Sequence, residues 1–202
     1  MRRISQRCRR FFLGRDMPLG ISKRRIIHKS PFAVTVAFSK PEQAMIARLA
    51  EERQAPKEGH ASARDKRIMF RDNVATHLIG LMGEYAVSKT LGVPFDQEAY
   101  VAGDLVKDMV IFGVNVEIKT LQGYLTFRVI EDFVADVAVL VTYKAGVFDQ
   151  VTIQGWIDRP TFAACHFQDD FGYGVRPCMQ PDRLHPIFTL KSYCEVKAEK
   201  YG

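Results

Sequence analysis

Hydrophobic residues along this chain recur first at helical spacing and then, from about residue 105, at the spacing of β-strands. In the clearest helical part, apolar side chains such as Val74 and Leu78 return every three or four positions as far as Leu91. Gly92 stands where a helix often ends in a left-handed glycine, and Pro94 cannot continue a helix. The pattern therefore predicts a long amphipathic helix that ends at about Leu91.

A strand and a shorter helix are predicted upstream of this long helix. Residues 34–38 alternate between apolar and other side chains, which favours a short strand. Ser39 follows, with Glu42 three positions later, and this pair forms the capping box that begins many helices. The helix should end before Pro56, and the polar residues 56–67 predict a surface loop.

The second half of the chain is rich in β-forming residues. Residues 106–112 and 114–120 flank Gly113 and predict a hairpin. The order of helix, hairpin, further strands and helix indicates an α/β (α+β) fold, with a mixed sheet flanked by helices. Downstream we expect strands at 125–130, 134–143 and 151–157, a short helix from Asp158, an irregular stretch over 167–186, and a last strand at 187–190.

Composition limits the protein class. With 202 residues, of which 47% are hydrophobic, the chain fits one domain with a substantial core. No stretch approaches the roughly 20 apolar residues that span a bilayer, and the N-terminus lacks the apolar segment of a signal peptide. We therefore expect a cytoplasmic protein, with a basic arm at 1–30, a domain at 31–202 whose C-terminal region is irregular, and no membrane partner.

The positive charge is concentrated in that arm. The net charge is +6, but residues 1–30 hold ten Lys or Arg against the single acid Asp16, so the other residues together carry −3. This distribution is typical of an arm that binds a polyanion. A solvated tail and a mitochondrial-type presequence are the alternatives. A start at Met17 would remove six of the ten basic residues.

Three charged residues of the predicted hairpin form a candidate catalytic group. Glu117 and Lys119 are two positions apart, so both side chains lie on one face of their strand. A short turn around Gly113 brings Asp108 opposite Ile118 or Lys119, with cross-strand Cβ atoms about 5 Å apart. Two carboxylates and an ammonium group would then share one face of the hairpin.

Such a group suits metal-assisted hydrolysis of a phosphodiester. Mg²⁺ prefers oxygen ligands and keeps several waters, so two carboxylates and a carbonyl oxygen suffice to bind it, and Mn²⁺ is a substitute. The metal lowers the pKa of a bound water and polarises the phosphate. Lys119 could orient that water or neutralise the developing charge. Asp104 is a rival to Asp108, because four residues along an extended chain return to the same face.

The motif of Asp108, eight residues, Glu117, one residue and Lys119 follows a helix that carries Gly83 and Glu84. Over about residues 76–157 this motif and its preceding helix resemble the PD-(D/E)XK nuclease superfamily. The wider sequence pattern is similar to that of small phage and mobile-element nucleases. The resemblance implies a restriction-endonuclease-like αβββαβ core, with Glu84, Asp108 and Glu117 as metal ligands and Lys119 as the motif lysine. It also implies a Mg²⁺-dependent deoxyribonuclease, located in the bacterial host cytoplasm if phage-encoded. Lys107 stands where the motif proline is often found.

Several alternatives to this interpretation stay open. The chain could be a non-catalytic nucleic-acid-binding protein, its substrate could be RNA, or Glu117 and Lys119 could be an ordinary surface ion pair. The sequence leaves open endonuclease or exonuclease action and the oligomeric state, including a homodimer. Residues expected to contact nucleic acid phosphates without reading sequence are Arg9, Arg10, Lys23, Arg24, Arg25, Thr120 and Gln122.

Other residues that could carry chemistry are explained better by ordinary structural roles. Cysteine and histidine residues near the C-terminus could bind zinc, but their spacing matches no common finger, and buried free thiols are the preferred interpretation. His77 precedes Glu84 by about two helical turns and could reach the site. Tyr124, Phe127 and Arg128 could stack on a nucleotide, although core packing is the preferred role. The zinc candidates are Cys165, His166, Cys178, His185 and Cys194.

Overall fold

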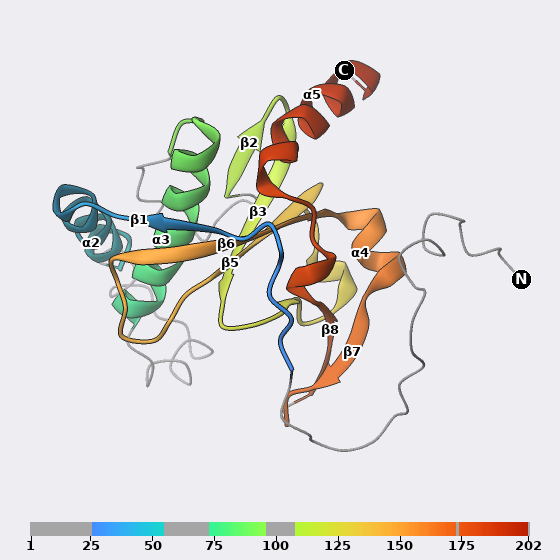
Figure 1. Ribbon diagram of the computed structural model, residues 1–202, viewed down its shortest axis with the longest axis horizontal. Helices are drawn as coiled ribbons and strands as arrows, with labels where there is room; N and C mark the ends of the chain where they lie inside the picture. The colour runs from blue at the N-terminus through green and yellow to red at the C-terminus, as the bar shows by residue number, and fades with distance from the viewer. Residues whose placement is uncertain (1–25, 55–72, 96–107, 173, 202) are drawn as a thin grey trace, which may run out of the picture.

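The computed structural model describes residues 26–54, 73–95, 108–172 and 174–201. Its helices and strands run through these residues in a mixed order (Figure 1). The helices are α2 (Lys40–Gln54), α3 (Asn73–Leu91), α4 (Arg159–Cys165) and α5 (Leu190–Tyr201). The strands are β1 (Val34–Ala37), β2 (Met109–Ile111), β3 (Val114–Leu121), β4 (Leu125–Thr126), β5 (Val137–Thr142), β6 (Gln150–Asp158), β7 (Phe167–Asp170) and β8 (Val175–Met179).

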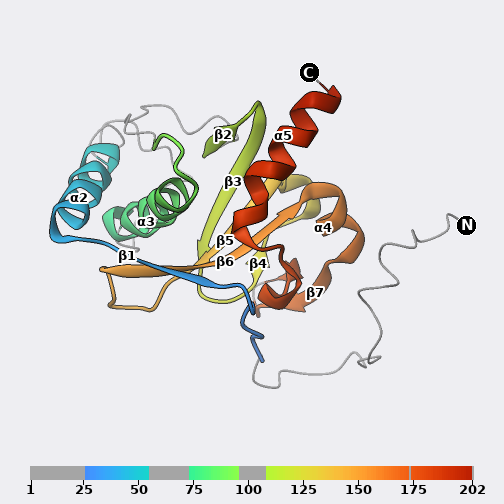
Figure 2. The same ribbon diagram turned by 45° about the horizontal axis from the view of Figure 1, so that its top comes forward.

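A mixed five-stranded sheet forms the centre of the fold, in the order β1-β6-β5-β3-β2. The pair β3 and β5 is parallel, and the other neighbours are antiparallel. Helices α3 and α2 lie on one side of this sheet, while α4 and a smaller sheet lie on the other (Figures 1 and 2). The smaller sheet has the order β4-β8-β7. The expected fold class of a mixed sheet flanked by helices is confirmed at this level.

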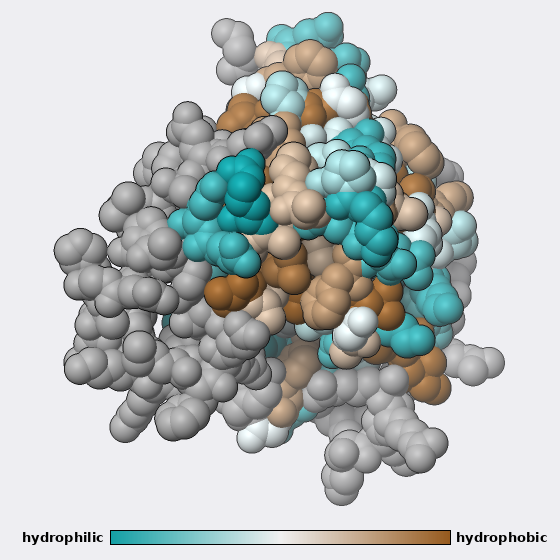
Figure 3. Space-filling model, turned by 90° about the vertical axis from the view of Figure 1, so that its left-hand side faces the viewer, coloured by the Kyte–Doolittle hydropathy of each residue, from teal (hydrophilic) through white to brown (hydrophobic). Residues whose placement is uncertain are grey.

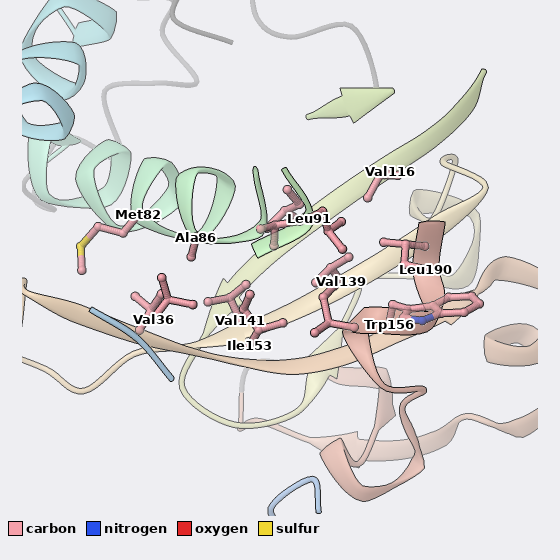
Figure 4. Close-up of a cluster of buried hydrophobic side chains, with 14 of the residues drawn as sticks. Val36, Met82, Ala86, Leu91, Val116, Val139, Val141, Ile153, Trp156 and Leu190 are labelled. Carbon is pink, nitrogen blue, oxygen red and sulfur yellow. The ribbon is translucent and has the colours of Figure 1, made fainter. Parts of the chain in front are cut away.

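The central strand β5 is buried on both faces, as its apolar sequence predicted. Val139 and Val141 belong to a core cluster that extends to α3 and α5, whereas Ala138 and Leu140 belong to a second cluster under α4. Figure 4 shows the first cluster, where Met82 and Ala86 of α3 lie above the valines of the sheet. The two clusters therefore distinguish the two faces of the sheet.

Both long helices begin or end with the predicted local signals. The Ser39 backbone N–H donates to Glu42 Oε2 at 2.6 Å, and the Glu42 N–H donates back to Ser39 Oγ at 3.5 Å, which confirms the capping box. At the end of α3, Gly92 takes φ +61°, the left-handed conformation expected of a helix-terminating glycine. The loop predicted at 56–67 lies outside the described residues.

The predicted hairpin is formed by β2 and β3 around a two-residue turn, Phe112–Gly113. Both turn residues have positive φ, +47° and +78°, as a tight hairpin turn requires. The register pairs Met109 with Val116 and Ile111 with Val114. The paired register begins at Met109, so Asp108 lies one position before β2, and its predicted place opposite Ile118 or Lys119 stays a prediction.

Three expectations for the C-terminal half are wrong. Residues 125–130 form only a two-residue strand, which joins the smaller sheet. The stretch 167–186 is not irregular throughout, because it contains β7 and β8. Residues 187–190 are a 3₁₀ turn leading into helix α5 and not a strand.

The described surface on the α2 side mixes hydrophilic and hydrophobic residues (Figure 3). This agrees with α2 itself, where buried Ile46 and Leu49 alternate with exposed charged residues such as Glu52. Among the described helices, none combines the length and the apolar character needed to cross a bilayer.

Candidate active site

The hairpin brings Glu117 and Lys119 to one face of the central sheet and the Asp108 carboxylate to the strand that carries them. Val116 and Ile118 point into the core cluster shared with α3. Because side chains alternate along a strand, Glu117 and Lys119 point to the opposite face, toward the second cluster. Asp108 directly precedes β2, and its carboxylate accepts from the backbone N–H of Ile118, the residue between Glu117 and Lys119. The shared face is thus observed for Glu117 and Lys119, and for Asp108 it stays a prediction.

Glu117 and Lys119 form a close ion pair on this face. Lys119 Nζ lies 2.5 Å from Glu117 Oε1, with side-chain exposures of 34% and 16%. The Lys119 ammonium group also lies 5.3 Å from the centroid of the Phe127 ring. Phe127 is buried and stacks on Phe133, with ring centroids 4.6 Å apart. The Lys119 ammonium group therefore lies over a buried, stacked aromatic ring, which limits the positions that it can take. The burial of Phe127 agrees with its preferred role in the core.

The carboxylate of Asp108 is fixed by the backbone of the facing strand. The Ile118 N–H donates to Asp108 Oδ2 at 2.5 Å, and the Asp108 N–H donates to the Val116 carbonyl at 3.1 Å. Ile118 lies between Glu117 and Lys119, so this bond ties the aspartate to the motif of the neighbouring strand. Among the described residues, β2 pairs only with Val114–Val116, and Asp108 is the point at which this ladder ends.

Glu84 lies on α3, on the other side of β3 from the Glu117 and Lys119 side chains. Its carboxylate accepts from Arg53 Nη1 of α2 at 3.2 and 3.5 Å. Both side chains are 16% exposed. The structure thus brings together the three hairpin residues, while Glu84 is bound to a cation from the neighbouring helix. Nothing in the local sequence around Arg53 singles it out, because the pair depends on how α2 packs against α3.

Thr120 and Gln122 follow the hairpin lysine but face different surroundings. Thr120 Oγ1 is buried and, within the described part of the chain, has no hydrogen-bond partner. It faces α3 at close range, since a Cβ added at Gly83 would be 1.9 Å from it. Gln122 is exposed just after β3. Thr120 therefore packs on the α3 face, away from Lys119, and Gln122 alone of the two is accessible.

Several candidate residues lie in parts of the chain that the structure does not describe. Asp104 lies outside the described residues. The same holds for the basic residues expected to contact phosphates, which are Arg9, Arg10, Lys23, Arg24 and Arg25. His77 is on α3. In the ranges that the structure describes, no three Cys, His, Asp or Glu residues form a group that could hold a metal ion.

The three cysteines in the described residues are free thiols in separate parts of the domain. Cys194 belongs to the cluster shared with α3, and burial raises the pKa of its thiol to about 11. Cys178 is buried in the smaller sheet, where its Sγ lies 3.5 Å from Thr126 Oγ1. Cys165 is half-buried. These placements agree with the preferred interpretation of free thiols.

Comparison of the chain with protein-family models, curated proteins and solved structures finds no match in any of the three.

Proposed function

We propose that this protein is a metal-dependent nuclease that hydrolyses DNA phosphodiester bonds, with Asp108, Glu117 and Lys119 at its active site. The observation that carries the proposal is the hairpin geometry. Lys119 lies beside Glu117 on one face of β3, and the Asp108 carboxylate accepts from the backbone N–H of Ile118 between them. Two carboxylates and a lysine gathered at one part of the hairpin are what the motif requires.

The residues present fit a hard divalent cation in part. Asp108 Oδ2 lies 2.5 Å from the backbone nitrogen of Ile118, the residue after Glu117, and a metal ion bound there would be shared by the two carboxylates. Mg²⁺ is commonly held by one or two carboxylates and completes its shell with water. When bound, it would activate a water and polarise the phosphate. Lys119 would leave its ion pair with Glu117 and neutralise the charge that develops on the phosphate.

Glu84 is the weaker part of this assignment. It lies across β3 from the hairpin pair, and Arg53 neutralises its charge. Glu84 and the hairpin carboxylates could bind one metal ion only at the edge of β3 next to Asp108, where the described pairing of β3 with β2 ends. In that case a metal ion would take over from Arg53 as the counter-charge.

The proposed core also differs from the αβββαβ order of the PD-(D/E)XK superfamily. Helix α3 and strands β2, β3 and β5 follow the first four elements of that order. The described loop 143–149 then joins β5 directly to β6, and helix α4 follows β6 instead of preceding it. The superfamily assignment therefore depends on the hairpin and not on the complete core.

A non-catalytic nucleic-acid-binding protein is the second candidate. The observation that favours it is that Glu117 and Glu84 are each paired with a basic residue, Lys119 and Arg53. A protein that only binds would keep these ion pairs. A nuclease would exchange them for a metal ion and a phosphate.

Cleavage of DNA tests the proposal. Supercoiled plasmid and linear, single-stranded and branched DNA are incubated with Mg²⁺, Mn²⁺ or EDTA, and RNA is assayed in parallel. Wild type should cut only with metal, and Lys119→Ala should lower the rate at least about 100-fold, the usual size of such a contribution. Lys144→Ala, at an exposed loop lysine, is the matched control and should cut like wild type. A wild-type protein that shifts DNA in a gel but never cuts it would support the binding protein instead.

A further inference from the structure

The Lys119 ammonium group has two partners of different kinds. Its Nζ lies 2.5 Å from Glu117 Oε1, and it also lies over the Phe127 ring, 5.3 Å from the ring centroid. A cation within about 6 Å of the centroid of an aromatic ring is attracted by the negative face of the ring. Glu117 therefore holds the lysine through a full charge, whereas Phe127 attracts it without carrying one.

Two other buried rings hold the Phe127 ring in place. Phe127 is 3% exposed and stacks on Phe133, with an angle of 5° between the rings and 4.6 Å between their centroids. The ring of Phe162, from α4, meets both of them edge-on, at centroid distances of 5.2 and 5.5 Å. All three rings belong to the second core cluster, so Phe127 has little room to move away from the lysine.

The two partners of Lys119 respond differently when a metal ion binds, a step that rests on the proposed function for the site. Glu117 then shares its charge with a divalent cation, and the ammonium group is repelled by that cation. The attraction of the Phe127 ring does not depend on the Glu117 charge, so it remains. The ring would therefore keep Lys119 at the site when its ion pair with Glu117 is lost.

We propose that Phe127 is a positioning residue for Lys119, and that its ring holds the ammonium group beside the phosphate while Glu117 binds the metal ion. Phe127 is buried and does not touch the substrate, so it acts only through the lysine. A ring that merely fills the core matters through its volume, whereas a ring that positions a cation also matters through its electrons. The two roles can be separated by changing the electrons and keeping the volume.

Ring fluorination makes this separation, because each fluorine weakens the attraction of a ring for a cation and changes the size of the side chain little. Phenylalanine analogues with one, two or three ring fluorines are introduced at position 127 alone, and cleavage is measured with Mg²⁺ on the DNA that wild type cuts best. The Lys119 side chain is 34% exposed, so the attraction is that of an exposed pair. The kcat should fall stepwise, by about two- to fivefold in all, with little change in KM.

Phe38 provides the matched control for this series. It is a buried phenylalanine of the other core cluster, where its ring contacts Tyr85 at a centroid distance of 5.9 Å. The same analogues at position 38 should leave kcat as in wild type. A kcat that does not follow the number of fluorines at position 127, or that follows it equally at position 38, would overturn the proposal.

A measurement without DNA or metal tests the contact between lysine and ring directly. The free energy of unfolding is measured in urea and EDTA for the fluorinated chains, each with Lys119 and with Lys119→Met, which removes the charge and keeps an unbranched side chain. Fluorination at position 127 should destabilise the chain more with Lys119 than with Lys119→Met. Equal losses in both backgrounds would show that the ring does not attract the lysine.

Glu117→Gln tests whether this attraction survives the loss of the carboxylate charge. The variant keeps the shape of the Glu117 side chain and removes the charge that metal binding would neutralise. The extra loss seen with Lys119 should be at least as large in Glu117→Gln as in the chain with Glu117. An extra loss that disappears in Glu117→Gln would mean that the ring holds the lysine only together with the ion pair, which contradicts the proposed role.

The proposal for Phe127 and the nuclease proposal fail separately. Metal-dependent cleavage that is insensitive to fluorine at position 127 would refute the role of Phe127 and leave the nuclease proposal standing. A chain that shows the coupling between Lys119 and the ring but never cuts DNA or RNA would refute the nuclease proposal and leave Phe127 as the residue that positions Lys119.

Discussion

The close contact between α3 and β3 at Gly83 makes an unusual prediction for a glycine in a helix. Replacing glycine by alanine inside a helix normally stabilises it by about 1 kcal/mol, because alanine loses less conformational entropy. At Gly83, however, the new Cβ would be 1.9 Å from Thr120 Oγ1 and 3.2 Å from Thr120 Cβ. The threonine or the whole helix must therefore move.

The magnitude follows from these two opposing effects. Overpacking of a well-packed core typically costs about 1–3 kcal/mol. After the helix-propensity gain of about 1 kcal/mol, Gly83→Ala should lower the free energy of unfolding by up to about 2 kcal/mol. Gly80 is the matched control in the same helix, since its Cβ would meet only Glu84 Oε1 at 4.0 Å. Gly80→Ala should be neutral or stabilising by up to about 1 kcal/mol.

Urea denaturation followed by circular dichroism measures both variants, and a second substitution identifies the cause. Thr120→Ala removes the hydroxyl group that the new methyl group meets. In the double variant the loss should shrink, with a coupling energy of about 1–2 kcal/mol. If Gly83→Ala is as stable as Gly80→Ala, or if Thr120→Ala gives no rescue, the close contact of α3 with β3 is wrong. That result would also remove the structural reason for a glycine directly before Glu84.

Three further predictions concern charge and thiols. Hydrogen bonds from Lys89, the Ser39 N–H and the Tyr85 hydroxyl lower the pKa of Glu42 from 4.5 to about 2. The contribution of this carboxylate to the free energy of unfolding is therefore present above pH 4.5 and is lost as the pH falls toward 2. Glu42→Gln should therefore melt at a lower temperature than wild type at pH 7, and the difference should vanish near pH 2; a gap that persists there would contradict this. In native protein at pH 8, a thiol reagent should modify Cys165 faster than the buried Cys178 and Cys194, and zinc chelation should leave the melting temperature unchanged. Arg53→Ala should lose about 1–3 kcal/mol of stability, and Mg²⁺ should restore part of it if Glu84 is a metal ligand; an equal response to Mg²⁺ in wild type and variant would argue against that role.

Local signals in the sequence predicted the elements that local physics determines. The capping box at Ser39 and the turn glycines Gly92 and Gly113 act through bonds and dihedral angles within a few residues. The hairpin was predictable for the same reason, and its two-residue turn pairs Met109 with Val116. A face shared by residues two apart on a strand needs no tertiary information at all.

The C-terminal half was harder to predict because its strands lack the usual pattern. Strand β7 has the sequence FQDD, whose two acids are untypical of strands. Strand β8 contains Pro177, which cannot donate a ladder bond. The structure accommodates this proline because β4 pairs only with Cys178 and Met179, and the Pro177 carbonyl accepts from the Phe127 N–H at 3.3 Å and from Thr126 at 3.1 Å. Only packing between distant segments reveals these strands.

The same distinction between local and distant contacts separates the two halves of the candidate site. Asp108, Glu117 and Lys119 come together through one hairpin, and the face that Glu117 shares with Lys119 follows from their spacing alone. The position of Glu84 depends on how α3 packs on β3 and on whether a partner such as Arg53 reaches it, and neither follows from spacing. A carboxylate that is mostly buried is costly without a counter-charge, so Glu84 needs Arg53, a metal ion, or both in turn. Which of these balances its charge is the point on which a nuclease and a protein that only binds nucleic acid differ.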